Sequence, residues 1–397
     1  MAHNPAREAT VRHGKRIRLC MKDLYHQDVV EMIERETRKY EIWSIDSPSH
    51  PDFKPAYDLL WAAFGPQNEM EPERTVRKWL REDPFSPVET GTYIKYFMIV
   101  ARGPDGGVRG VRDGCILVNQ EYDPDLCVVY LAHIYMLPEA RGTVLSYWLR
   151  ISPVELAMQY LKDLHDEGLI KLPAPDAPGR HFGMRINLTA EMEYFAPEDR
   201  LSLQRILFYG RGGFDVIDPR HFPYLQPDFR TEEEIEATGY RPIPFMILLR
   251  RMGRERQARL DIEEAAGTMR LLYDEFASFC DSDRLAESLD RVLDRLDRRQ
   301  AQGKDYVDLL PMPTGPQDLR RLRPLWRYRV YKLFYPDDAE AQDYMARVRP
   351  IIGGNRRWLT ERLEEIAATL EERPPYVYQN RDRGFTWEGV RIREPGE

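Results

Sequence analysis

The chain has 397 residues, of which 42% are hydrophobic and 31% charged, and its formal net charge is −8. Its length exceeds what one domain usually needs, and its composition excludes a disordered or low-complexity protein. The acidic balance gives no general attraction to nucleic acid or to anionic membranes, so we expect neither as a partner.

Residues 1–40 are interpreted as a basic arm followed by a helix. No apolar run of signal-peptide length follows the arm, and no later stretch approaches the ~20 apolar residues of a membrane span. The cysteines lie apart and form no CxxC pair, which favours neither a zinc site nor a disulfide framework; they are Cys20, Cys115, Cys127 and Cys280. We therefore expect a cytoplasmic protein without a bound metal.

A hairpin and a buried strand are predicted after two short helices between residues 55 and 81. The strand-like runs at 92–101 and 108–119 are separated by RGPDGG, whose glycines accept the positive φ of hairpin turns. A third run, 127–137, is almost continuously apolar and ends at Pro138, which is typical of a strand buried on both faces. These runs form the centre of the predicted sheet.

Helices and strands alternate after that run. The pattern predicts helices at 144–165 and 196–211 and strands at 181–188, 214–218 and 242–252. Glycines end the second helix, in the segment GRGGF.

From residue 253 the composition shifts to charged, amphipathic helical sequence without a further strong strand. Apolar residues recur at helical spacing in one such segment, at Leu285, Leu289, Val292 and Leu296. The predicted fold is therefore α/β, with a mixed central sheet flanked by helices over residues 41–252 and a helical domain over 253–397. The C-terminal helices could form a homodimer contact or shape a substrate site.

The segment YMLPEARGTVLS, residues 135–146, leads from the end of a strand through a polar turn into a helix. Free N–H groups and the positive end of the helix dipole favour a phosphate at such a place. Gly142 would let the backbone approach closely, and Arg141, Thr143 and Ser146 would add donors. Such turns are also common as purely structural features, and that reading stays open.

Two motifs together resemble the GNAT N-acetyltransferase superfamily. In that family a strand ends in V-x-P-x-x-[RQ]-x-x-G-x-[GA], and here Met136, Pro138 and Arg141 occupy the corresponding places. The family's Y-x-x-x-G-F helix end is matched by YGRGGF, residues 209–214, and the order of elements over 41–252 also agrees. The resemblance implies a GNAT-like sheet and acyl transfer from acetyl-CoA, or another coenzyme A thioester, to an unknown amine.

The resemblance also assigns residues to the acyl donor. The turn that would hold its pyrophosphate consists of Met136, Leu137, Arg141, Gly142, Thr143, Val144, Leu145 and Ser146. Where the family has glycine and then glycine or alanine, this chain has Val144 and Ser146. A non-catalytic binding protein with the same fold is therefore the alternative. An acyltransferase that uses aminoacyl-tRNA would need a basic RNA groove, which the acidic chain does not indicate.

Acyl transfer requires a polarised carbonyl, a base for the amine and an acid for the leaving thiolate. By resemblance, a backbone amide near Met136 or Leu137 would polarise the carbonyl, and Tyr209 would be the acid. His133 is a candidate base, on the same strand face as Tyr135. Tyr209 could equally be a packed residue at a helix end, and a lone histidine in an apolar strand is more often a core residue.

Glu191 and Glu193 are the competing candidates for the base. Both are predicted to lie on a loop after the strand at 181–188. Acidic residues on loops are more often only solvated.

Overall fold

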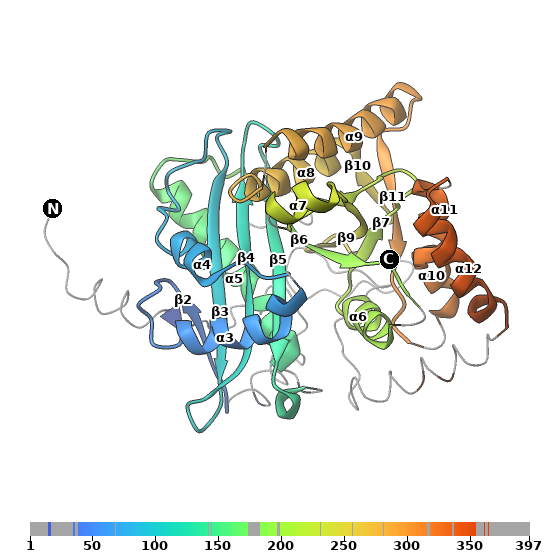
Figure 1. Cartoon of the computed structure of the whole chain (residues 1–397). Coiled ribbons are helices and arrows are strands. Elements are labelled where there is room, and N and C mark those ends of the chain that lie inside the picture. Colours follow the sequence, from blue (N-terminus) through green and yellow to red (C-terminus); the bar gives the residue numbers. More distant parts are fainter. Residues whose placement is uncertain are drawn as a thin grey trace, which may run out of the picture. The chain divides into compact units, whose positions relative to one another are not determined.

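The structure is a computed structural model. It describes residues 15–16 and 39–354, except 68, 142, 144, 174–182, 197–198, 231, 256, 281, 316–317 and 336, together with residues 35, 361 and 364. The chain divides into two compact units, the first ending at Leu188 and the second beginning at Thr189. Figure 1 shows the elements in chain order. Most of the helix predicted within residues 1–40 lies outside the described residues.

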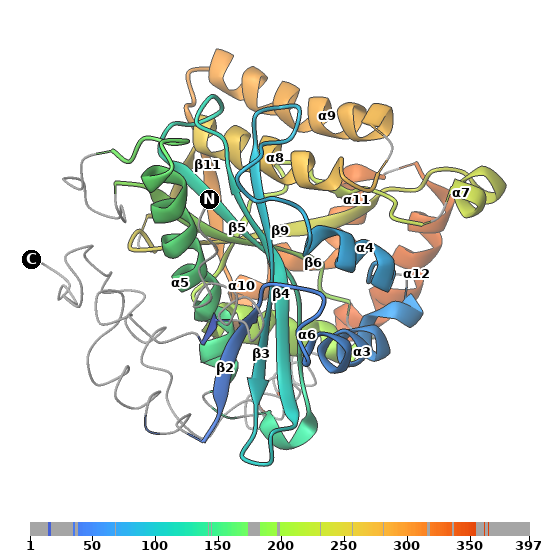
Figure 2. The ribbon, with the colours of Figure 1, turned by 90° about the vertical axis from the view of Figure 1, so that its left-hand side faces the viewer.

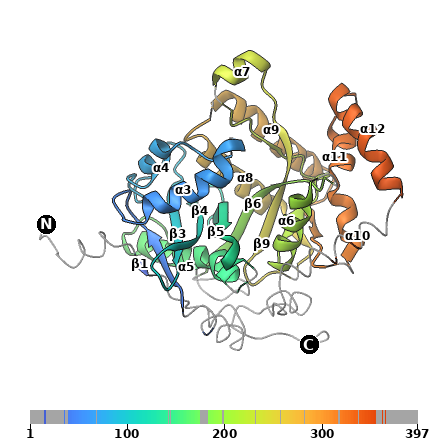
Figure 3. The same cartoon turned by 60° about the horizontal axis from the view of Figure 1, so that its bottom comes forward.

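The strands of the first unit are antiparallel and follow one another in chain order. They are β1 (Lys15–Arg16), β2 (Glu41–Ile45), β3 (Tyr93–Arg102), β4 (Val108–Val118) and β5 (Leu126–Met136). The helices are α3 (Phe53–Phe64), α4 (Glu73–Trp79) and α5 (Leu145–Asp166), with 3₁₀ turns η2 (Gly65–Gln67) and η3 (Pro138–Ala140). Figures 2 and 3 show α3 and α4 on one face of these strands and α5 on the other.

The predicted hairpin is confirmed as β3 and β4. The Gly103 amide donates to the Gly107 carbonyl at 2.8 Å, and Gly106 has φ 78°, a conformation that glycine adopts without strain. On one side of the strands, α3 buries Phe53, Tyr57 and Leu60 because these residues recur at helical spacing. The hairpin and α3 therefore follow the apolar patterns that predicted them.

In the second unit the strands lie in the order β6-β9-β7-β11-β10, with β8 beside β9. They are β6 (Arg185–Glu193), which continues from the first unit, β7 (Asp215–Ile217), β8 (Leu225–Gln226), β9 (Ile243–Arg251), β10 (Arg259–Asp261) and β11 (Tyr306–Pro311). The helices are α6 (Arg200–Arg211), α7 (Glu232–Thr238), α8 (Ile262–Phe276), α9 (Ser282–Ala301), α10 (Leu319–Leu322), α11 (Arg327–Phe334) and α12 (Ala339–Gly354), with the 3₁₀ turn η5 (Arg323–Leu325). Helix α8 contacts β10 and β11, whereas α11 contacts β9 and α12.

The mixed α/β class is confirmed, but a separate helical domain over 253–397 is not. Strands β10 and β11 both follow residue 253, and β11 pairs with β7 through Leu309 and Ile217. The run YVDLLP is short and carries only the alternating buried residues Val307 and Leu309, so it gave no strong strand signal. The predicted helix around Leu285 is confirmed as α9, which buries Leu285, Val292 and Leu296.

Every helix in the described ranges is too short or too polar to cross a bilayer. No group of three or more His, Cys, Asp or Glu side chains suited to a metal ion occurs among the same residues.

Candidate functional site

A β-bulge in β5 lies opposite Asp113 of β4. Arg112 pairs with Ile134 and Gly114 with Leu131, so two residues of β5, Ala132 and His133, face the single residue Asp113. A Cβ at Gly114 would lie 1.9 Å from the Tyr130 carbonyl oxygen, so only glycine permits this approach. The bulge turns the His133 amide out of the regular ladder and toward the Asp113 side chain.

The Asp113 carboxylate is buried, with 2% of its side chain exposed. It accepts the His133 amide at 2.9 Å, His133 Nδ1 at 3.0 Å and the Tyr96 hydroxyl at 2.9 Å. Burial and the Asp113 charge raise the pKa of Tyr96, which keeps its hydroxyl protonated and donating. These donors compensate the cost of burying the carboxylate.

His133 has an acceptor at each ring nitrogen. Nδ1 faces Asp113, and Nε2 lies 2.5 Å from the Glu69 carbonyl oxygen, while the ring packs on Phe64 with centroids 4.9 Å apart. Burial alone would lower the pKa of His133, but the Asp113 charge and hydrogen bond raise it to about 9. His133 is therefore an imidazolium at neutral pH. In this arrangement it has no free nitrogen to accept a proton, which disfavours the predicted role as base.

Glu71 lies close enough to His133 for their charges to interact. Burial raises the pKa of Glu71, and the His133 charge partly opposes that rise. The nearby backbone is fixed by Tyr57, whose hydroxyl donates to the Glu71 carbonyl at 3.0 Å. Sequence reasoning missed both acids. A charged residue within an apolar strand is a signal for Asp113, whereas Glu71 lies in a breaker segment that gives none.

Hydrogen bonds within the chain occupy several amides of the turn after β5. The Leu137 amide donates to the Arg109 carbonyl at 2.9 Å, the Ala140 amide to the Leu137 carbonyl at 2.9 Å, and the Arg141 amide to the Pro138 carbonyl at 3.2 Å. An incoming anion would have to displace these bonds or use other donors. The predicted phosphate cradle of amides is therefore only partly available.

Side chains of the turn after β5 also make hydrogen bonds within it. Arg141 Nε donates to the Met136 carbonyl at 2.9 Å, and the guanidinium lies 5.3 Å from the Tyr135 ring centroid. The Thr143 hydroxyl accepts from the Leu145 amide at 3.3 Å, as an N-cap does. The Ser146 amide and hydroxyl both donate to the Thr143 carbonyl. Two further predicted residues, Gly142 and Val144, lie outside the described residues.

In the second unit, Tyr209 lies at the end of α6 with 8% of its surface exposed. Its ring packs edge-on against Phe208 and Phe214, with centroids 5.4 and 5.2 Å apart. This environment matches a packed aromatic residue, and the role as acid stays a prediction.

The glycines of YGRGGF have local structural reasons. A Cβ at Gly210 would lie 2.0 Å from the Pro313 carbonyl oxygen, so the backbone after β11 passes directly against this helix end. Gly213 has φ 78°, as helix-ending glycines do. Arg211 Nε adds a hydrogen bond to the Thr314 carbonyl at 2.9 Å. Close packing therefore accounts for Gly210, and backbone conformation accounts for Gly213.

Glu191 and Glu193 were predicted to lie on a loop. This is wrong, because β6 continues to Glu193 and contains both residues. The Tyr224 hydroxyl donates to Glu191, and Arg205 pairs with Glu193 at 3.0 Å. Each carboxylate therefore has a hydrogen-bond or ion-pair partner in the second unit.

No protein-family model matches the sequence, and no curated protein shows significant similarity to it. Among solved structures, one provisionally named a phosphinothricin N-acetyltransferase is similar over 51% of this chain and 94% of its own. Sequence identity is 15% and the TM-score is 0.27. Similarity at this level does not assign the chain to a family or an activity.

The His133 ion pair gives the first unit a pH-dependent stability. Since the pKa of His133 is raised from 6.5 to about 9 on folding, its contribution is complete below pH 6.5 and is lost as pH rises through 9. We expect His133→Gln to reduce the free energy of unfolding most at pH 6 and below, by about 3 kcal/mol, and progressively less toward pH 9.5. Denaturant titrations of both proteins across this range measure the difference, and His165→Gln is the control. A difference that stays constant or grows with pH would exclude the imidazolium assignment.

Proposed function

We propose that the chain is an N-acyltransferase that moves an acyl group, most simply acetyl, from a coenzyme A thioester to an amine. The observation that supports this best is the passage from β5, with its bulge at His133, through Pro138 into a turn and the 22-residue helix α5. The start of a long helix and the exposed Arg141 suit an anionic pyrophosphate. The donor would be bound by the Arg141 guanidinium and the positive end of the α5 dipole more than by the amides of the turn.

The strand end also offers a donor for the acyl carbonyl. Hydrogen-bonded and non-bonded pairs alternate along an antiparallel ladder. Since the Leu137 amide bonds to Arg109, the adjacent pair of Met136 and Gly110 is of the non-bonded kind, and the Met136 amide points away from β4. Of the two amides predicted for this role, we therefore assign it to Met136.

We assign the role of base to Glu71. His133 has a positioning role, because its charge lies close to the Glu71 carboxylate and interacts with it. The amine nitrogen attacks the thioester carbon, its proton passes to the Glu71 carboxylate, and the C–S bond breaks. The raised pKa of Glu71 suits a carboxylate to this task, because a base works best when its pKa lies near the pH at which the enzyme acts. The departing thiolate takes up one proton, which water can supply; Tyr209 stays the acid that the sequence motif predicts.

A non-catalytic binding protein is the second candidate. The occupied amides of the turn and the local packing reasons for YGRGGF favour it, because neither motif then requires a ligand. Binding and turnover measured separately distinguish the two functions.

Arg141→Ala should weaken binding of acetyl-CoA by about 1–3 kcal/mol, the range for losing a hydrogen bond to a charged group. The fold should persist because Arg141 is exposed. Isothermal titration calorimetry measures the dissociation constant, with Arg81→Ala as an exposed control in the same unit. If wild type binds no acyl-CoA at millimolar concentration, the proposed function fails. If wild type binds and the variant binds equally, the turn is not the site.

Tyr209→Phe keeps the ring and its packing but removes the proton donor. If Tyr209 is the acid, thiol release from acetyl-CoA with a panel of amines should fall by ~10²-fold or more while binding is unchanged. Tyr328→Phe, in the same unit, is the control. Unchanged turnover removes Tyr209 from the mechanism.

Glu71→Gln should lower turnover by a similar ~10²-fold and abolish the rise of turnover with pH on the acidic side of the wild-type profile. The rise occurs because a base must lose its proton, and the pKa of Glu71 lies above its ordinary value. Glu82→Gln, at an exposed position near the end of α4, controls for the lost charge. A variant that retains the acidic limb would show that the base is elsewhere.

A further inference from the structure

Three aromatic rings follow one another along α3, each about one turn after the last. The ring centroids of Phe53 and Tyr57 are 6.1 Å apart, and those of Tyr57 and Trp61 are 5.9 Å apart with the ring planes inclined by 19°. Phe53 and Tyr57 are buried, whereas 41% of Trp61 is exposed. The series therefore ends in a ring that is open to solvent.

The neighbours of Trp61 hold its ring in one position. A Cβ at Gly65 would lie 2.6 Å from the indole ring, so the ring rests directly on the backbone of the next turn. Tyr57, stacked one turn earlier, supports the ring from within the same helix. The exposed surface of Trp61 is therefore formed before any ligand arrives, as small-molecule sites usually are.

Each of the other two rings of the series carries a cation of the chain. The Arg77 guanidinium lies 4.4 Å from the Phe53 ring centroid, and the Lys54 ammonium lies 6.0 Å from the Tyr57 ring centroid. Among the described residues, no cation lies over the Trp61 ring. Indole attracts cations more strongly than the rings of phenylalanine and tyrosine do. The ring best suited to a cation is thus the one that the chain leaves open.

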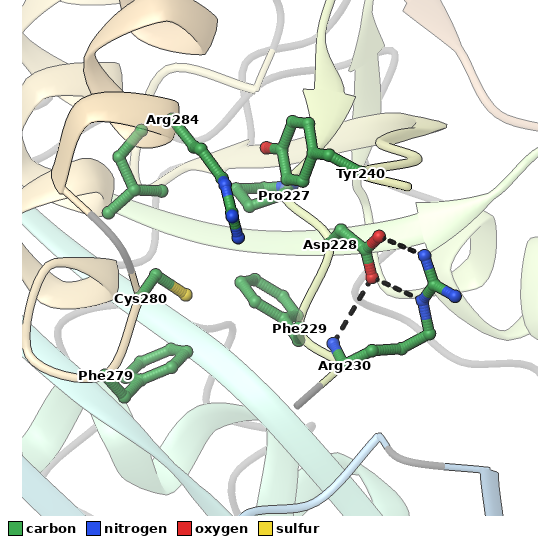
Figure 4. A pocket seen from close by; sticks show the side chains of 9 residues that line it. Pro227, Asp228, Phe229, Arg230, Tyr240, Phe279, Cys280 and Arg284 are labelled. Carbon is green, nitrogen blue, oxygen red and sulfur yellow. Dashed lines mark hydrogen bonds and ion pairs between the residues drawn. The ribbon is translucent and has the colours of Figure 1, made fainter. Parts of the chain in front are cut away.

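A cation beside an aromatic ring also occurs in the second unit. A hollow of about 360 Å³, counting its open mouth, lies there between the loop at 227–230 and the start of α9 (Figure 4). In its wall the Arg284 guanidinium lies 5.5 Å from the Tyr240 ring centroid. This contact therefore recurs in the chain, and Trp61 presents the same kind of surface without a cation of its own.

Trp61 borders the site proposed for acyl transfer. The Tyr57 hydroxyl donates to the Glu71 carbonyl at 3.0 Å, so a single tyrosine side chain separates the indole from the loop that carries the proposed base. Phe64, near the end of the same helix, packs on His133 with ring centroids 4.9 Å apart. A flexible acceptor held at Glu71 can therefore extend to Trp61.

The charges around these rings suit a positively charged acceptor. Lys54 pairs with Asp58, and Arg77 pairs with Glu73 at 2.7 Å, so the cations on the first two rings are each balanced by an acid. A further cation would therefore meet little repulsion from them. An anion would gain nothing from the face of the indole, which carries the negative part of the ring quadrupole.

We propose that Trp61 binds a second cationic group of the acceptor, so that the substrates of this chain are diamines or longer polyamines. One nitrogen of such a molecule loses its proton to Glu71 and is acylated, as described above. Another nitrogen stays protonated and lies over the indole face, and it is unchanged by the reaction. This role for Trp61 rests on the proposed acyltransferase function, to which it adds the class of acceptor.

Three acceptors of equal length separate charge from size. Cadaverine is a diamine, hexylamine has a methyl group in place of one ammonium group, and aminocaproate has a carboxylate there. Thiol release from acetyl-CoA gives kcat/KM for each acceptor with the full-length protein. After allowance for its two equivalent amines, we expect cadaverine to exceed hexylamine by about 2- to 30-fold, the range that a cation–π contact supplies. Aminocaproate should be the poorest acceptor.

Variants at Trp61 test the source of this preference. Trp61→Leu should remove most of it, and Trp61→Phe should keep part of it because a phenyl ring binds cations more weakly. Leu169→Ala, at another exposed apolar position of the first unit, should keep all of it. The preference is a ratio measured on one sample of each variant, so a partly unfolded sample does not change it.

The possible outcomes separate the role of Trp61 from the acyltransferase function. Equal kcat/KM for cadaverine and hexylamine in wild type, or a preference that persists in Trp61→Leu, would overturn the role of Trp61 and leave the acyltransferase function standing. No thiol release with these acceptors or with the wider panel of amines would overturn the acyltransferase function, and the role of Trp61 with it.

Discussion

The buried carboxylate of Asp113 is the constraint on which the local geometry of the first unit depends. A carboxylate in a strand interior is costly unless donors surround it. Here one donor is a backbone amide released by a bulge, one is an imidazolium and one is a phenol. Gly114 is required because the chain passes so close to Tyr130. Bulge, glycine and side chains therefore act together, and the effects of substitutions among them should not be additive.

The same carboxylate changes the chemistry available to its neighbours. By holding His133 as a cation, it converts the residue type most often used as a base into a fixed positive charge. A fixed cation beside Glu71 favours the ionised form of that carboxyl, whereas burial favours the protonated form. The balance between these effects determines whether Glu71 can take a proton from an amine near neutral pH.

The spacing of apolar residues predicted those elements whose buried face is long enough to leave a clear pattern in the sequence. The β3–β4 hairpin, β5 and α9 were predicted because each has a long pattern of buried residues. Strands β10 and β11 were missed because they are short, and β6 extends further than predicted, through Glu191 and Glu193. The protonation of His133 could not be predicted, because its two acceptors lie 20 and 64 residues away in the sequence. The two motifs behind the family resemblance are present in the sequence, but hydrogen bonds and packing within the chain also explain much of each.

Strand β11 lies between β7 and β10, so the sheet of the second unit is complete only after a late segment of the chain has been synthesised. Strands β7 and β9 are synthesised earlier, so until Tyr306–Pro311 emerges, β7 presents an unpaired edge. Exposed edges of this kind are templates for pairing between chains. During synthesis, and in any product ending near residue 252, this short edge of β7 would lack its partner strand and be open to such pairing.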